Sequence, residues 1–333
     1  MRSSNPLKKK AAAKHNSKLR DANSAKAGDQ SSHKSGAKPQ DTSHVKAHLK
    51  LHSKTHPKRG GKFQRAKLRQ IIFTKAIDRI LKGRLTRRHF EQPIAFREIE
   101  IAVPNWPRAF DGLRIGHLSD LHWGELMPLN RAIELVERLD SARIDMLACT
   151  GDVVDLEWKG CEPLLKAMGE IRAPLGRYLV LGNHDHLDDA VEFAAAAAHH
   201  KLDVLHESVA TRRRAEHDLR VAGIDWNKSP KALRASVEAI AHTRPHLLLT
   251  HNPKAFAAAS DAGIPLVLAG HTHGGQVALR NKPQKNMALA HRHSSGFYEQ
   301  GVSRLFVNVG AGAWFPYRRN VPAEIVVLVA RRG

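Results

Sequence analysis

The stretch LRIGHLSDLH, residues 113–122, is a mostly apolar run that ends in Asp120 and His122. The run DMLAC at residues 145–149 has the same form and continues into Asp152. Short β-rich runs bounded by turn residues are typical of buried strands. Because sites in α/β sheets are built at the ends of strands, both stretches predict a sheet with a polar site at its edge.

Short β-rich runs alternate with helical stretches from about residue 97 onward, which predicts an α/β fold with substantial sheet. The expected strands are residues 113–118, 145–149, 177–181, 220–224, 246–250, 266–269, 304–309 and 324–329. The expected helices are residues 129–142, 161–171, 188–200, 231–241 and 253–262.

Five of these strands lead into residues that ligate hard or borderline metal ions. The blocks are Asp120-Leu121-His122, Gly151-Asp152-Val153-Val154-Asp155, Gly182-Asn183-His184-Asp185, Thr250-His251-Asn252-Pro253 and Gly270-His271-Thr272-His273. In an extended segment, two side chains at positions two apart leave the same face and reach one ion. We therefore expect each of the two Xaa-x-His pairs to share an ion.

The number of donor groups predicts two ions rather than one. The blocks supply three carboxylate or amide groups and four imidazoles, which is too many for one tetrahedral site. The carboxylate of Asp152 can bridge two cations, and two metal ions about 3.5–4 Å apart are the usual device for displacement at phosphorus. Oxygen and imidazole ligands without thiolate suit Mn²⁺, Fe or Zn²⁺, of which we expect Mn²⁺.

The five blocks, in this order, resemble the calcineurin-like metallophosphoesterase superfamily over residues 97–333. The resemblance implies a four-layer α/β/β/α sandwich of two mixed sheets. It also implies an enzyme that hydrolyses a phosphodiester or pyrophosphate bond by a metal-activated hydroxide. By this resemblance one ion would take Asp120, His122, Asp152 and His273, and the other Asp152, Asn183, His251 and His271.

Two departures narrow the resemblance. Leu156 and Asp185 stand where protein Ser/Thr phosphatases carry Arg and Glu, which disfavours that branch. The extended block at 270–276 and the segment 310–318 resemble bacterial membrane-associated phosphodiesterases. That group includes a type of UDP-2,3-diacylglucosamine diphosphatase of lipid A synthesis, which makes a lipid-linked nucleotide the finer substrate expectation. The other type of that enzyme carries Arg where His184 stands.

His184 is the predicted general acid or transition-state stabiliser, because the ligand scheme does not require it. Asp155 follows Asp152 by three residues, where its carboxylate can orient the His184 imidazole. Arg318 is expected in a phosphate-facing loop that binds substrate, with a solvated arginine as the alternative. Asp185 is expected to hold its loop by a hydrogen bond.

Positive charge is concentrated at the amino terminus. Residues 1–90 hold 25 of the 54 Lys and Arg and 4 of the 32 Asp and Glu, so nearly all of the net charge of +22 lies there. This excludes a protein that is basic throughout and indicates a balanced body with a polycationic leader. Residues 1–62 contain no Phe, Trp or Tyr and predict a disordered tail, which either binds nucleic acid or is a solvated extension.

Residues 63–92 are expected to be a basic amphipathic helix and linker before a phosphoesterase domain at 93–333. The apolar side chains that follow helical spacing are Leu68, Ile71, Ile72, Ala76, Ile77, Ile80 and Leu81. Two alternatives remain open for residues 63–90. The stripe can lie on an anionic membrane, or it can pack on the sandwich.

Other features exclude further classes of protein. No apolar run approaches the roughly 18 residues of a membrane span, and Arg87-Arg88 lacks the apolar segment of an export signal. The only cysteines, Cys149 and Cys161, exclude a disulfide scaffold. We expect a cytoplasmic enzyme, peripheral at the inner membrane surface if the helix binds lipid. The alternatives are a nuclease that uses the tail, and a binding protein on a degenerate scaffold, against which the complete ligand set argues.

Overall fold

The computed structural model describes residues 60–280 and 282–333. The predicted tail at residues 1–62 lies outside this range except for its last three residues. Gly61 and Lys62 already belong to the first helix, α2 (Gly61–Gln70). The predicted disorder of the tail and its proposed partners therefore lie outside the described residues.

Two mixed six-stranded sheets form the body of the protein. The first contains, in spatial order, β1 (Ala95–Val103), β14 (Glu324–Arg332), β2 (Leu113–Leu118), β3 (Met146–Cys149), β4 (Arg177–Leu179) and β5 (Asp203–Val204). The second contains β12 (Gly296–Gln300), β13 (Ser303–Val307), β9 (Leu266–Ala269), β8 (Leu247–Leu249), β7 (His217–Gly223) and β6 (Ser208–Arg214). A separate hairpin pairs β10 (Ala278–Leu279) with β11 (Lys282–Asn286).

Parallel pairing runs through the centre of each sheet. Strands β2 to β5 are parallel to one another, and so are β7, β8, β9 and β13. The antiparallel neighbours are β14 with β2, β12 with β13, and β6 with β7. Parallel strands carry their carboxyl ends to one edge, so the loops that follow β2, β3 and β4 share an edge of the first sheet, and those after β8 and β9 share an edge of the second.

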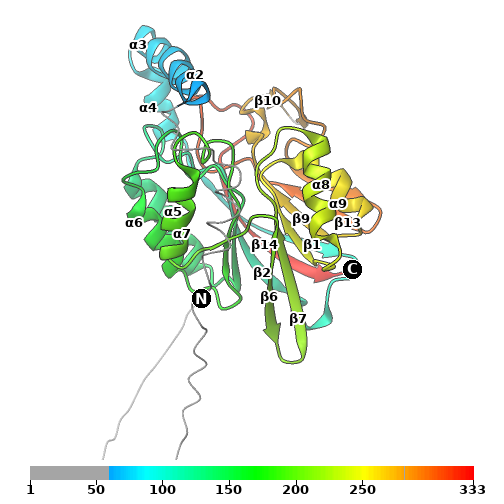
Figure 1. The fold of residues 1–333 in the computed structure, drawn as a ribbon. Coiled ribbons are helices and arrows are strands. Elements are labelled where there is room, and N and C mark those ends of the chain that lie inside the picture. Colours follow the sequence, from blue (N-terminus) through cyan, green and yellow to red (C-terminus); the bar gives the residue numbers. More distant parts are fainter. Residues whose placement is uncertain (1–59, 281) are drawn as a thin grey trace, which may run out of the picture. The chain divides into compact units, whose positions relative to one another are not determined.

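The central strands are buried on both faces, which explains their continuous apolar runs. Leu247 and Leu249 of β8 face the core between the two sheets, whereas Leu248 faces the helices outside. Helices α5 (Leu129–Ser141), α6 (Glu162–Glu170) and α7 (Ala190–His199) cover the first sheet, and α8 (Pro230–Ala241) and α9 (Phe256–Asp261) cover the second (Figure 1). The predicted four-layer α/β/β/α sandwich is confirmed.

A helical segment precedes β1 and lies at the end of the sandwich that also carries β10 (Figure 1). It consists of α2, the π-helical turn η1 (Ile71–Ala76), α3 (Ile77–Ile80) and α4 (Arg84–Glu91). Phe63, Thr74 and His89 are its buried residues, and His89 Nε2 lies 2.9 Å from the carbonyl oxygen of Leu126. The segment is therefore attached to the body along its length.

The apolar stripe of this segment mostly faces outward. Leu68, Ile71, Ile72, Ile80 and Leu81 are 40–76% exposed. The alternative in which the stripe packs on the sandwich is therefore wrong for most of its residues. Among the helices in the described part of the chain, none is long and apolar enough to cross a membrane.

Candidate active site

All five predicted blocks meet where the carboxyl ends of the central strands of the two sheets approach each other. Asp120 and His122 follow β2, Asp152 follows β3, and the remaining blocks follow β4, β8 and β9. The structure thus brings together all six Asp and His residues of the predicted ligand set, although the set is divided between two sheets and more than 150 residues of sequence. A shared edge for parallel strands explains the convergence.

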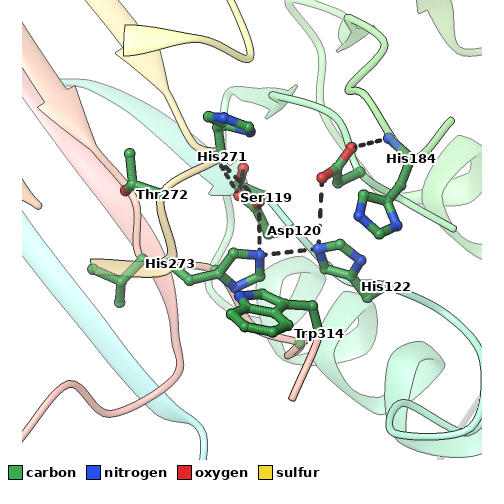
Figure 2. Close-up of polar contacts among 12 residues, drawn as sticks. Ser119, Asp120, His122, His184, His271, Thr272, His273 and Trp314 are labelled. Atoms are coloured by element: carbon green, nitrogen blue, oxygen red, sulfur yellow. Dashed lines mark hydrogen bonds and ion pairs between the residues drawn. The ribbon is translucent and has the colours of Figure 1, made fainter. Parts of the chain in front are cut away.

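Two clusters of candidate ligands lie side by side. Asp120, His122 and His273 form the first cluster, in which His273 Nε2 lies 3.3 Å from Asp120 Oδ1 and 3.0 Å from His122 Nε2 (Figure 2). Asp152, His251 and His271 form the second, in which His251 Nε2 lies 3.2 Å from both Asp152 Oδ2 and His271 Nδ1. The assignment of these residues to two separate ions stays a prediction of the family resemblance.

Asp152 connects the two clusters. Its Oδ2 lies 3.5 Å from His122 Nε2 as well as 3.2 Å from His251 Nε2. A third group of donor atoms, His122, Asp152 and His184, lies between them. The carboxylate therefore occupies the position that a bridging ligand requires.

The backbone at these residues is strained. The φ angles of Asp120, His122, Asp152, His271 and His273 are 50°, 47°, 51°, 73° and 51°. Each such left-handed residue costs about 1–2 kcal/mol relative to the right-handed region, so the surrounding structure must hold it in place. The expectation of an extended Asp-x-His segment is wrong, because the side chains converge through this turned backbone instead.

Two glycines let the loops approach each other. A Cβ at Gly182 would lie 2.2 Å from Asp152 Oδ1, and one at Gly270 would lie 2.3 Å from Asp120 Oδ2. Any side chain at either position would push into the carboxylates. The glycines in these blocks are thus part of the geometry of the site.

The chemistry of the donors fits divalent metal ions. Asn183 Oδ1 is buried and has no hydrogen-bond partner among the described residues, so it is free to ligate a cation. Burial lowers the pKa of His271 and of His273 well below the ordinary value, so both imidazoles are neutral, as metal ligation requires. Burial alone would raise the pKa of Asp152, but His251 and His184 outweigh it and hold that pKa well below its usual range.

His184 is held on its Nδ1 side. Nδ1 lies 2.5 Å from the carbonyl oxygen of Asp155 and 3.2 Å from Asp155 Oδ1, and the backbone N–H of His184 donates to Asp152 Oδ1 at 2.7 Å. Burial disfavours the charged imidazole, but the carboxylates of Asp152 and Asp155 outweigh it and raise the pKa of His184 to about 9. The arrangement leaves Nε2 as the nitrogen available to a substrate.

Arg318 lies in a different environment from the one predicted. Its guanidinium is buried and donates to the carbonyl oxygens of Val309 and Gly312, while Nη2 lies 3.2 Å from His273 Nδ1. Burial lowers the pKa of Arg318 to about 10. The side chain supports the 310–318 loop and His273 rather than presenting its charge to a phosphate.

Other residues of the site follow or extend the prediction. Asp185 holds its loop as expected, since its carboxylate accepts hydrogen bonds from the backbone N–H groups of Asp152, Val154 and Gly182. Trp226 was not predicted, although its ring centroid lies 4.5 Å from that of His271. A single aromatic residue after a strand gives no signal of its own in the sequence.

An apolar cavity of about 440 Å³ adjoins the candidate metal ligands. It begins at His271 and reaches η1 of the amino-terminal segment. Its apolar lining residues are Phe73, Val277, Met287, Ala288, Trp314, Phe315 and Tyr317. The cavity was not predicted, because its walls come from segments that are far apart in the sequence.

These features define a metallophosphoesterase domain. Residues 113–275 match the family model for calcineurin-like phosphoesterases. The chain therefore contains a calcineurin-like phosphoesterase domain, as the sequence blocks predicted.

Individual relatives agree with this class. An uncharacterised metallophosphoesterase of Campylobacter jejuni is 26% identical over 70% of the chain, and a bovine transmembrane protein with a metallophosphoesterase domain is 29% identical over 72%. The chain spans 62% and 57% of the length of these two relatives. Among solved structures, the NAD nucleotidase of Haemophilus influenzae aligns with 61% of this chain and 50% of its own, at 16% identity and a TM-score of 0.40.

The position of Asp152 predicts the effect of Asp152→Asn. The variant should lose bound metal and diesterase activity while keeping its fold, because the amide cannot bridge two cations with the charge of a carboxylate. Metal content per chain and hydrolysis of bis-p-nitrophenyl phosphate measure this. Asp218→Asn is the control, because Asp218 is exposed and lies at the start of β7, whereas the candidate ligands follow the carboxyl ends of the strands. Two ions per chain together with the wild-type rate would contradict the central role of Asp152.

The environment of Arg318 predicts that Arg318→Met acts on stability. Each buried carbonyl left without a donor costs about 1–3 kcal/mol, which should lower Tm by about 5 °C or more. KM for a small diester should change little. The control is Arg319→Met, because Arg319 is the exposed neighbour. A raised KM without a change in Tm would instead support the original substrate-binding prediction.

Proposed function

We propose that this protein is a dinuclear metal-dependent phosphoesterase that hydrolyses a phosphodiester or pyrophosphate bond. The observation that carries the proposal is the convergence of six Asp and His donors, five of them in strained backbone, beside the buried Oδ1 of Asn183. The six are Asp120, His122, Asp152, His251, His271 and His273. One ion would be held by Asp120, His122, Asp152 and His273, and the other by Asp152, Asn183, His251 and His271. Divalent ions bound there neutralise phosphate oxygens and activate water, and Mn²⁺ suits this set of oxygen and imidazole donors.

His184 assists the leaving group in this proposal. Asp155 fixes the Nδ1 side of the ring, so Nε2 is directed to the substrate and can donate a proton or a hydrogen bond to the leaving oxygen. Asp155 acts as a positioning residue, because its contacts are with imidazoles. Its Oδ1 lies 3.2 Å from His184 Nδ1 and 3.4 Å from His122 Nδ1. One carboxylate thus orients both imidazoles.

His184→Ala is expected to keep near-normal metal content and to lower kcat by about 10²–10⁴, the usual effect of losing a positioned acid or base. The loss should be smaller for a p-nitrophenyl diester than for an alkyl diester, since p-nitrophenolate needs little protonation. His199→Ala, in exposed helical sequence, is the control. A variant that loses metal together with rate would identify His184 as a ligand.

The apolar cavity favours a substrate with an apolar group, such as a lipid-linked nucleotide of the UDP-2,3-diacylglucosamine type. His271, a candidate metal ligand, lines one end of the cavity. A substrate whose apolar chain occupied the cavity could therefore place its phosphate at the metal site. Hydrolysis rates for bis-p-nitrophenyl phosphate, UDP-2,3-diacylglucosamine and single-stranded DNA, with Mn²⁺ supplied, test this directly. The nuclease alternative depends on the tail, which lies outside the described residues, and activity on DNA alone would support it.

The exposed helical stripe favours a peripheral position on the cytoplasmic side of a membrane. Ile72 and Ile80 are 45% and 76% exposed, and basic side chains surround them on the same segment. The exposed basic residues are Lys62, Arg65, Lys67, Arg69, Lys75, Arg79, Lys82, Arg84, Arg87 and Arg88. An amphipathic basic helix of this kind binds anionic lipid by apolar burial and surface attraction together.

Ile80→Asp is expected to weaken binding to anionic phosphatidylglycerol vesicles by about tenfold, since burial of an isoleucine contributes about 1.5–3 kcal/mol. Tm and activity on a soluble diester should stay at wild-type values. Val302→Asp is the matched control, because Val302 is also exposed but lies in the turn between β12 and β13, at the opposite end of the sheet. Vesicle binding that is equal in both variants would contradict a role for the stripe, as would binding that depends only on residues 1–62.

A further inference from the structure

Arg69 of α2 reaches the candidate active site from a segment 115 residues upstream of His184. Its Nη2 lies 3.4 Å from His184 Nε2, the nitrogen that faces the substrate. Its guanidinium also lies over the ring of Trp314, 5.5 Å from the ring centroid. A planar guanidinium stacked on an aromatic ring keeps its N–H groups in a fixed plane.

The next residue, Gln70, enters the same hydrogen-bond network. Its Nε2 donates to Asp155 Oδ2 at 3.0 Å, and the other oxygen of Asp155 contacts His184. Two consecutive residues of α2 therefore meet the two residues that assist the leaving group. Lys75 forms a 3.2 Å ion pair with Glu125, and Phe63 and Thr74 are buried, so the segment is fixed on both sides of Arg69.

The charge around Arg69 indicates an anionic ligand. Within the part of the chain that the structure describes, its recorded partners are an imidazole and an aromatic ring, and no carboxylate pairs with it. An arginine beside a histidine gains little from that contact, whereas an anion placed against both groups would bond to each. Because the guanidinium offers two parallel N–H donors, it matches a phosphate better than a single alcohol oxygen.

We propose that Arg69 binds the leaving group of the substrate, and that this leaving group is itself a phosphate. The inference rests on the proposed function and deepens it, because it selects a pyrophosphate bond over a simple phosphodiester bond. Water adds its oxygen to one phosphorus, and the bond from that phosphorus to the bridging oxygen breaks. The bridging oxygen leaves with the bonding electron pair on the second phosphate, where His184 supplies a proton or hydrogen bond. Arg69 pairs with the outer oxygens of that phosphate, and the products are two phosphate monoesters.

The test compares two soluble substrates on the full-length, metal-loaded protein. UDP-N-acetylglucosamine releases a phosphate leaving group, whereas bis-p-nitrophenyl phosphate releases p-nitrophenolate, which carries no phosphate oxygens. Arg69→Ala should lower kcat/KM for the diphosphate by about 10- to 100-fold, the effect of losing a charge-assisted bidentate contact, and for the diester by less than about threefold. Arg69→Lys should retain part of the charge effect and fall between wild type and Arg69→Ala.

Two further variants separate this role from a structural one. Lys67→Ala removes one exposed positive charge from the same helix and should leave kcat/KM unchanged for both substrates. Gln70→Ala acts through Asp155 and His184, so, like His184→Ala, it should lower kcat less for a p-nitrophenyl diester than for an alkyl diester. Arg69→Ala should instead leave both diesters within about threefold of the wild-type rate, because neither releases a phosphate. Metal content and Tm should stay at wild-type values in Arg69→Ala.

The outcomes distinguish the two proposals. An equal loss on both substrates, or no loss on the diphosphate, would overturn the role of Arg69. A wild-type protein that cleaves the diester but neither UDP-N-acetylglucosamine nor UDP-2,3-diacylglucosamine would overturn the phosphate leaving group and leave the phosphoesterase proposal standing. A metal-loaded wild-type protein that cleaves none of the three would overturn the phosphoesterase proposal itself.

Discussion

A carboxylate buried among imidazoles is the constraint on which the rest of the site depends. Asp152 accepts the backbone N–H of His184 on one oxygen and contacts His122 and His251 with the other. An isolated buried carboxylate is prohibitively costly, so its position requires cationic or hydrogen-bonding partners on every side. The carboxylate of Asp185 accepts the backbone N–H of Asp152, and Gly182 leaves room for the Asp152 side chain. The ends of β3 and β4 are therefore placed around one functional group.

The sandwich supplies the rigidity that this arrangement needs. Apolar side chains fill the core between the two sheets and both outer faces, so the central strands cannot shift without breaking close packing. Strained residues persist only where the surroundings over-determine them, and here each strained loop is anchored by a strand buried on both faces. The backbone N–H of His271, for example, donates to both carboxylate oxygens of Asp120 across the two sheets. The cost of the strained turns is thus offset by the packing below them.

The accuracy of the sequence predictions follows from how local each signal is. Strands β2 and β9 match their predicted bounds because an apolar run stops abruptly at polar residues. Strands β1 and β6 were missed because both carry charged residues on exposed positions, as edge strands do. The convergence of the Asp and His blocks could be predicted because each block is complete within a few positions. Arg318 was misplaced because sequence does not tell a buried arginine that bonds to carbonyl oxygens from an exposed one.

The contacts of the amino-terminal helical segment could not be predicted from its sequence pattern. Its amphipathic spacing predicts which residues share a face, but not which loops that face meets. The structure directs Arg69 and Gln70 to His184 and Asp155, while Ile72 and Ile80 remain exposed. Phe73, which directly follows Ile72, lines the apolar cavity that begins at His271. One segment therefore contributes to the hydrogen-bond network of the site, to the wall of the cavity and to an exposed apolar surface. The exposed surface and the placement of Arg69 are consequently linked, because any shift of this helix would move the guanidinium relative to His184.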